Sequence, residues 1–155
     1  MEKLFLDNIE NNFPSLLSNR FIISVSGGLD SIVLLHLCRK LKLNFVIAHS
    51  NFKLRGEESD SDEKFVKKIA KKFKVEFYSK SFNTKELLVS TNKSVQMIAR
   101  DWRYQWFDKL SEELEVNYVL TAHHLDDNVE TVLINLIRGT GINGLLGIPD
   151  RKSVV

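Results

Sequence analysis

A short polar string between two apolar segments has the residue types needed to hold a phosphate group. It lies between the apolar runs 21–25 and 32–37 and consists of Ser26, Gly27, Gly28, Leu29, Asp30 and Ser31. The two glycines allow a sharp turn and a close approach of backbone to ligand, and the helix expected after them presents unpaired N–H groups with a partial positive charge. Ser26 and Ser31 add hydroxyl groups. The string therefore predicts a phosphate-binding turn.

Asp30 is an acid beside the expected anion, which is unfavourable unless a cation lies between them. Mg²⁺ commonly has that role for nucleotides, so we expect a nucleotide together with Mg²⁺. The alternative is a plain strand-to-helix turn in which Asp30 or Ser31 caps the helix. The spacing differs from that of a Walker loop, because no lysine follows the glycines, and from Gly-x-Gly-x-x-Gly.

A second dense polar segment, residues 121–131, follows a strand-like run and opens another helix. If Asp126 or Asp127 caps that helix, Glu130 lies one turn further on. His123 would lie beside them at the end of the strand. Such a group of acids and histidines indicates either a metal site or a site that binds an amine and handles a proton.

Two arginines in the segment 95–110 are candidates for anion binding. Arg100 and Arg103 lie one turn apart on one helix face, where they could stabilise phosphate charge or contact RNA. The alternative is a surface pair bonded to Asp101 or Asp108.

The segment 49–60 is long and rich in donors, as loops that close over substrates often are. Arg55 could clamp a carboxylate or phosphate, or could pair with Glu57 or Glu58. His49 is either a hydrogen-bonded residue at a strand end or a functional one.

Composition bounds the class of protein. The chain has 155 residues, 43% of them hydrophobic and 27% charged, which suits one globular domain. The sequence has neither an apolar run long enough to span a membrane nor a secretion signal, so we expect a cytoplasmic protein with no membrane partner. Cys38 is the only cysteine, which excludes an internal disulfide and a paired-thiol relay. A net charge of +2 does not by itself argue for nucleic acid.

Strand-like and helix-like segments alternate along the chain. Strands are expected at 21–24, 45–48, 75–78 and 118–122, and helices at 31–41, 60–73, 95–110 and 127–137. This order predicts an α/β fold, a Rossmann-like parallel sheet with helices on both faces. The ligand crevice of such a sheet lies beyond the carboxyl ends of the strands, where the polar segments at 26–31, 49–55 and 123–127 fall.

Two of the helices carry apolar residues at i, i+4 and i+8. These stripes are Phe65, Ile69 and Phe73, and Ile98, Trp102 and Trp106. We expect both stripes to face the core, the second in preference to a role in stacking nucleic-acid bases.

Taken in order, the motifs resemble a known family. The string 26–31 matches Ser-Gly-Gly-x-Asp-Ser, the PP-loop of ATP pyrophosphatases, which split ATP into AMP and pyrophosphate while adenylating a substrate. The tRNA(Ile)-lysidine synthetase family has this loop followed by His-x-Asn-His-x-Leu-Arg-Gly-Glu-Glu-Ser-Asp, Ala-Arg-x-x-Arg-Tyr, Ala-His-His-x-Asp-Asp-x-x-Glu-Thr and Arg-Gly-x-Gly. The chain resembles these at 49–60, 99–104, 122–131 and 138–141, with Phe52 in place of the second histidine of the first.

The resemblance implies a reaction in two steps. ATP adenylates O2 of the wobble cytidine in tRNA(Ile) with a CAU anticodon, and free L-lysine then attacks C2 and expels AMP, which gives lysidine. The implied ATP-binding residues are those of 26–31 together with His49, Arg138, Gly139 and Gly141. The implied catalytic residues are Asp30, which would also hold Mg²⁺, Arg100, His123, Asp127 and Glu130. Substrate binding is implied for Arg55, Arg103, Asp127 and Glu130.

Other interpretations of the sequence remain. Residues 1–155 would form the ATP-binding catalytic domain, cut short at its carboxyl end and without tRNA-recognition domains, and a homodimer is left open. One alternative is another PP-loop tRNA-modifying or amide-forming adenylating enzyme. A second is a nucleotide-binding module without turnover. A third is a metal-dependent phosphohydrolase with the ligands His49, His123, Asp126 and Asp127.

Overall fold

The structure is a computed structural model, and it describes residues 2–82 and 95–122. Its elements in chain order are α1 (Glu2–Asn12), the 3₁₀ helix η1 (Pro14–Leu17), β1 (Phe21–Ser24), α2 (Leu29–Lys40), β2 (Phe45–Asn51), α3 (Glu57–Phe73), β3 (Phe77–Ser81), α5 (Val95–Leu114) and β4 (Val119–Thr121). None of the helices in these two ranges is long and apolar enough to cross a bilayer.

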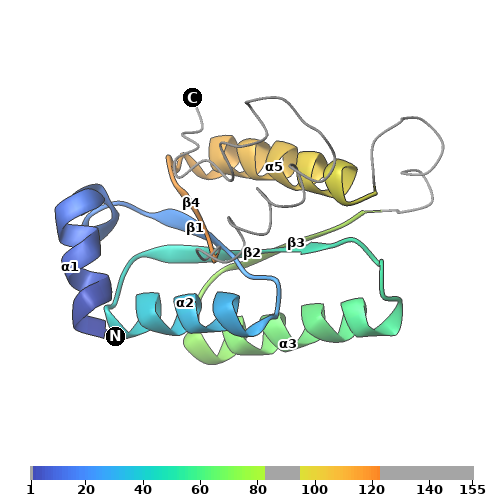
Figure 1. The fold of residues 1–155 in the computed structure, drawn as a ribbon, viewed down its shortest axis with the longest axis horizontal. Helices are drawn as coiled ribbons and strands as arrows, with labels where there is room; N and C mark the ends of the chain where they lie inside the picture. Colours follow the sequence, from blue (N-terminus) through green and yellow to red (C-terminus); the bar gives the residue numbers. More distant parts are fainter. Residues whose placement is uncertain (1, 83–94, 123–155) are drawn as a thin grey trace, which may run out of the picture.

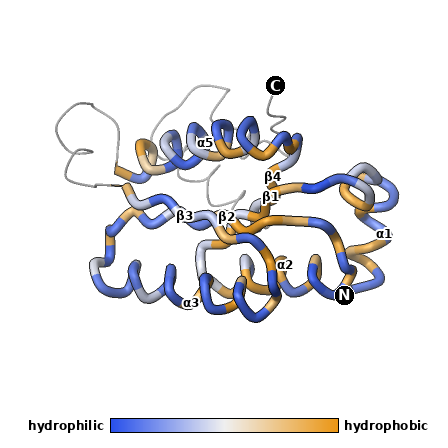
Figure 2. The backbone as a smooth tube through the Cα atoms, turned by 180° about the vertical axis from the view of Figure 1, so that it is seen from behind, coloured by the Kyte–Doolittle hydropathy of each residue, from blue (hydrophilic) through white to orange (hydrophobic). Residues whose placement is uncertain are grey.

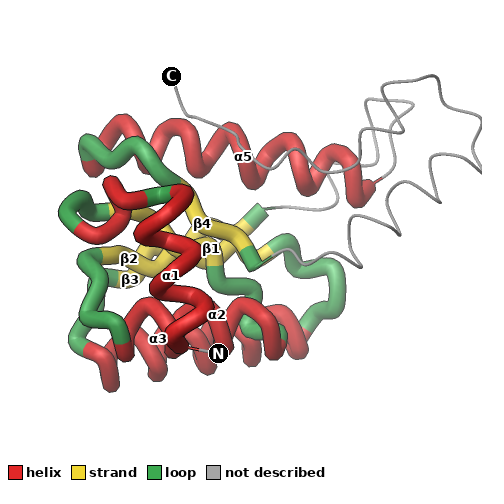
Figure 3. Tube along the Cα trace, turned by 60° about the vertical axis from the view of Figure 1, so that its left-hand side comes forward, coloured by secondary structure: helices red, strands yellow, loops and turns green. Residues whose placement is uncertain are grey.

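The four described strands form one parallel sheet in the order β3-β2-β1-β4. Helices α2 and α3 cover one face of the sheet and α5 covers the other, while α1 lies at one end (Figure 1). The view in Figure 3, turned by 60°, shows the same three layers. The expected α/β fold with helices on both faces is therefore confirmed.

Successive side chains of the central strands point to opposite faces of the sheet, so each face has its own hydrophobic core. Phe21, Ile23 and Val25 pack with residues of α2 and α3, such as Leu35 and Val66. The intervening residues of β1 and β2 pack against α5, in a cluster that contains Ile22, Val46, Ala48, Phe107 and Leu110. Hydrophobic residues accordingly run along β1 and β2 in the middle of the molecule (Figure 2). Strands that are buried on both faces are typical of parallel sheets.

Several expected boundaries were wrong by a few residues. Strand β2 continues to Asn51 instead of ending at Ala48, because its last three residues pair with β3, which itself runs over Phe77–Ser81 instead of 75–78. Helix α3 begins three residues earlier than expected, at Glu57. The helix α1 was not expected at all.

The expectation that Phe65 faces the core is also wrong. Its side chain is 47% exposed, whereas Val66 and Ala70 are buried and Ile69 and Phe73 pack beside them. Spacings of three and four residues place 66, 69, 70 and 73 on one helix face, and residue 65 lies about 100° away from Val66 around the axis.

Candidate active site

The strand order creates a crevice between β1 and β4. From β1 the chain crosses to β2 and β3 on one side, and it returns through α5 to β4 on the other side. The order of the strands thus reverses at β1, which has β2 on one side and β4 on the other. Open α/β sheets bind ligands at this kind of switch point.

A cavity of about 120 Å³ lies at this point. It is lined by Ser24, Ser26, Gly28, Asp30, Ser31, Arg103, Tyr104, Thr121 and Ala122. Three separate segments thus meet there: the turn between β1 and α2, one face of α5, and the end of β4. Tyr104 and Thr121 were not singled out from the sequence, although one follows Arg103 directly and the other stands at a strand end.

Hydrogen bonds within the turn hold its shape. The Gly28 N–H donates to Ser26 Oγ at 3.2 Å, and the Ser31 hydroxyl donates to the Gly28 carbonyl at 2.8 Å. The two serine hydroxyls lie 3.2 Å apart. Helix α2 begins directly after Gly28, and its first N–H groups have no carbonyl partner within the helix. Gly28, Asp30 and Ser31, at the start of this helix, line the cavity. This is the geometry that suits a bound phosphate.

The two glycines of the turn have different tasks. Gly27 has φ +98°, a region that L side chains rarely adopt, and a Cβ there would lie 3.2 Å from the Asp62 Cβ. Gly28 has φ −71°, and a Cβ there would meet only Ser26 Oγ, at 3.5 Å. The turn needs glycine at position 27 for its own conformation and for the contact with α3.

We therefore expect Gly27→Ala to lower the free energy of unfolding by about 1–3 kcal/mol, the usual cost of a residue held in a disfavoured backbone region. Gly28→Ala is the matched control and should change it by less than about 0.5 kcal/mol. Urea unfolding followed by circular dichroism measures both values. Equal losses in the two variants would contradict the assignment of separate tasks.

Asp30 lies in the first turn of α2 and lines the cavity. Its carboxylate stands beside the helix N-terminus that would bind phosphate. The described lining of the cavity thus offers one carboxylate, to which a nucleotide would add its phosphate oxygens. Mg²⁺ is commonly bound in this way, through one or two carboxylates and substrate phosphates. Within the described ranges no group of three or more His, Cys, Asp or Glu side chains could hold a metal ion. The residues present thus fit a Mg²⁺ ion that is shared with a nucleotide.

The two arginines of α5 occupy different places. Arg103 lines the cavity, and its guanidinium carbon lies 5.3 Å from the centre of the Phe52 ring. Arg100 is not among the cavity-lining residues, and its guanidinium carbon lies 5.5 Å from the centre of the Tyr104 ring. Loss of solvent around Arg103 lowers its pKa below the ordinary value, an effect that Tyr104 opposes and Arg100 increases. Of the two candidates, Arg103 is the one placed at the cavity.

His49 is buried next to the start of the glycine turn, residues 26–31. It is 2% exposed, and its Nδ1 is 2.8 Å from the Val25 carbonyl oxygen. Because a carbonyl can only accept, the hydrogen resides on Nδ1 and the ring ties β2 to the residue that precedes Ser26. His49 does not line the cavity, so its contact with ATP stays a prediction from the resemblance.

Asn51 organises the segment that follows β2. Its buried amide donates to Asp60 at 2.8 Å and to Glu63 at 2.9 Å, and its side-chain oxygen accepts from the Lys53 N–H at 2.9 Å. Desolvation raises the pKa of the Glu63 carboxyl, but hydrogen bonds from Asn51 and Ser79 and the charge of His49 outweigh it, so this pKa lies below its ordinary value. The sequence interpretation missed Asn51, whose signal was a polar residue at the end of a strand.

Arg55 is exposed and pairs with acids of α3. Its guanidinium donates to Asp62 at 3.1 Å and lies 3.8 Å from Glu58. Asp62 in turn packs against Gly27, and this contact links the loop 52–56 to the glycine turn. In this structure Arg55 therefore has the ion-pairing role that was the alternative to substrate binding, and its contact with substrate stays a prediction.

The remaining candidates from the sequence lie outside the described residues. They are His123, Asp126, Asp127, Glu130, Arg138, Gly139 and Gly141. The helix expected at 127–137 lies outside them too.

The parallel sheet, the glycine turn at its switch point and Arg103, which lines the same cavity, are the features of an α/β nucleotide-binding domain. The chain belongs to the PP-loop domain family, whose model matches residues 1–155.

Relatives named tRNA(Ile)-lysidine synthase match most of this chain. That of Bacteroides thetaiotaomicron is 42% identical over 147 residues, which are 95% of this chain and 34% of the relative. That of Porphyromonas gingivalis strain W83 is 44% identical over 132 residues, 85% of this chain and 29% of the relative. The chain thus spans about a third of the length of these curated relatives. The resemblance inferred from the order of the motifs is confirmed.

Solved structures of low sequence identity share the fold. The U34-tRNA thiolase NcsA from Methanococcus maripaludis superposes with a TM-score of 0.66 at 19% identity, over 89% of this chain and 52% of that one. The NH3-dependent NAD synthetase from Campylobacter jejuni gives 0.63 at 15% identity, over 90% and 59%. These similarities support the doubly covered parallel sheet.

Proposed function

We propose that this chain is the ATP-using part of an enzyme that joins L-lysine to the wobble cytidine of tRNA(Ile) with a CAU anticodon. One observation of the structure carries the proposal: Arg103 and the glycine turn line the same cavity at the switch point of the sheet. Membership of the PP-loop family and the names of the relatives support the choice of reaction. In this reaction ATP is cleaved to AMP and pyrophosphate.

The described residues have distinct tasks in the first step, the transfer of the adenylyl group to O2 of the cytidine. The backbone of the turn and the first N–H groups of α2 bind the phosphates that depart as pyrophosphate. Arg103, which lines the same cavity, stabilises the negative charge that develops on the phosphate groups. Asp30 would hold Mg²⁺, which when bound supplies positive charge to the phosphate oxygens.

The second step makes the cytidine carbon C2 the target of the amine of lysine, and AMP is the leaving group. Joining the oxygen to a phosphate beforehand turns a poor leaving group into a good one. We propose Asp127 and Glu130 as the residues that bind the lysine amine, with His123 nearby for positioning or proton transfer. These three assignments rest on the motif alone.

Recognition of the tRNA would need more surface than this cavity offers, because structured RNA is recognised by its shape and by splayed bases. We propose that the reaction takes place in the cytoplasm and that further parts of a longer protein select the tRNA. A homodimer remains a prediction.

The decisive experiment incubates the full-length protein that contains this chain with ATP, Mg²⁺, L-lysine and a tRNA(Ile) transcript with a CAU anticodon. Mass analysis of the nucleosides should show lysidine at the wobble position and one AMP for each modified tRNA. A reaction without lysine and a transcript with its wobble cytidine changed to uridine are the controls. An unmodified cytidine, when a relative's enzyme modifies the same transcript, would refute the proposal, and phosphate release without lysine or tRNA would favour a phosphohydrolase.

A further inference from the structure

The surroundings of Arg103 differ from those of a usual partly buried cation. No carboxylate oxygen in the described ranges lies within ion-pair distance of its guanidinium. A cation that loses solvent costs free energy unless another group compensates its charge. Among the described residues, an aromatic ring contacts this side chain instead.

This aromatic ring is that of Phe52. The guanidinium carbon of Arg103 lies 5.3 Å from the ring centre, within the range in which the negative face of an aromatic ring attracts a cation. The attraction is stronger where solvent is excluded, and Phe52 is 7% exposed.

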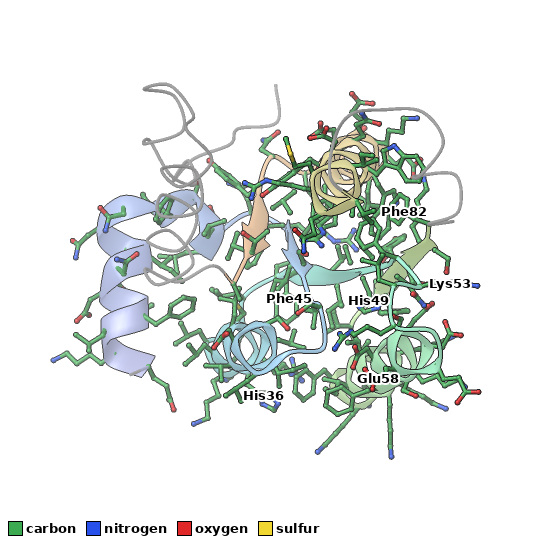
Figure 4. All side chains as sticks on the ribbon, turned by 45° about the vertical axis from the view of Figure 1, so that its right-hand side comes forward. His36, Phe45, His49, Lys53, Glu58 and Phe82 are labelled. Atoms are coloured by element: carbon green, nitrogen blue, oxygen red, sulfur yellow. The ribbon has the colours of Figure 1, made fainter. Side chains whose placement is uncertain are left out.

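The ring itself is fixed by other aromatic groups. Phe52 stacks on Phe82 with centroids 4.7 Å apart and planes inclined by 15°, and Phe82 contacts the Trp102 ring at 5.8 Å. Figure 4 shows Phe82 beside α5, the helix that carries Arg103. Trp102 and Trp106 pack against this cluster. The loop after β2 thus presents one face of a rigid ring to the cavity-lining arginine.

We propose that Phe52 is a positioning residue that holds the Arg103 guanidinium at the cavity for contact with nucleotide phosphate. The proposal rests on the proposed function, in that the cavity binds ATP. The family motif has histidine at this place, and a histidine that takes up a proton would set a second positive charge against the arginine. Phenylalanine keeps an aromatic face next to Arg103 at every pH.

The proposal predicts that ATP affinity depends on the electron density of the ring and not only on its volume. Phe52→Leu should weaken ATP binding about tenfold, as measured by titration calorimetry with Mg²⁺. Replacing Phe52 by mono-, di- and trifluorophenylalanine, which preserve the ring but weaken its negative face, should weaken binding step by step. In an Arg103→Ala background, Phe52→Leu should have no further effect.

Phe45→Leu is the matched control. Phe45 is 6% exposed and packs on Phe21 at the start of β2, well apart from Phe82 in Figure 4. It should lose comparable stability with no change in ATP affinity. A flat fluorination series, or equal affinity in Phe52→Leu and Phe45→Leu, would overturn the positioning role. ATP binding by the parent chain would in that case leave the ATP site of the proposed function standing.

A second measurement does not require nucleotide. The Arg103 side-chain NMR signals should be shifted upfield by the ring current of Phe52 and should lose this shift in Phe52→Leu. Unshifted signals would refute the contact itself. If the parent chain does not bind ATP, the proposed function fails and the positioning role fails with it, whatever these signals show.

Discussion

Asp30→Asn is expected to reduce AMP formation by about 100- to 1,000-fold while the chain stays folded. The substitution keeps the size and shape of the side chain, but it removes the charge and replaces one acceptor oxygen with an NH2 donor. Without the carboxylate, the cavity-lining residues lose the donor that fits a Mg²⁺ ion shared with the nucleotide phosphates. The measurement is the release of labelled AMP in the presence of tRNA, lysine and increasing Mg²⁺.

The effect on stability should be small. An acid in the first turn of a helix contributes about 0.3–1 kcal/mol through the helix dipole, so its loss does not unfold a domain of this size. Glu57→Gln is the matched control because Glu57 is an exposed acid in the first turn of α3 and does not line the cavity. If Asp30→Asn and Glu57→Gln retain the same AMP formation and the same Mg²⁺ requirement, Asp30 has no role in the reaction.

Much of the fold follows from short-range patterns. The apolar runs of β1 and the start of β2 are too short for helices and lie before polar turns, so these strands could be predicted. Their alternation with helices also predicted that the strands are parallel. The end of β2 could not be predicted, because His49, Ser50 and Asn51 look like loop residues. They are strand residues only because β3 pairs beside them and because the buried side chains of His49 and Asn51 find hydrogen-bond partners. Such partners come from distant parts of the chain.

Some parts of the candidate site could likewise be predicted from the sequence and others could not. The glycine turn was predictable, since its conformation depends on local residues and the conformational freedom of glycine. The choice between Arg100 and Arg103 was not, because both lie on one face of α5 and only the packing of that helix decides which of them reaches the cavity. The role of Phe52 likewise depends on β3 and α5, which bring Phe82 and Arg103 to it.

Arg103→Ala is the second large expected effect. It removes the cation that lines the cavity together with the glycine turn. Adenylation of tRNA should therefore fall by about 100- to 1,000-fold, the usual loss when a preorganised group that stabilises transition-state charge is deleted. Arg103→Lys should recover only part of this activity, because an ammonium group cannot reproduce the planar, multiply donating guanidinium. Single-turnover formation of AMP at saturating ATP measures the chemical step separately from binding.

Arg100→Ala provides the comparison that decides between the two arginines. Arg100 lies over the Tyr104 ring and not at the cavity, so its removal acts only through a cavity-lining neighbour and should cost about tenfold or less. Both variants remove the same charge from the same helix, which makes their net charge and helix propensity equal. A larger loss in Arg100→Ala than in Arg103→Ala would mean that Arg100 is the group that reaches the phosphate, and the assignment drawn from the cavity would be wrong.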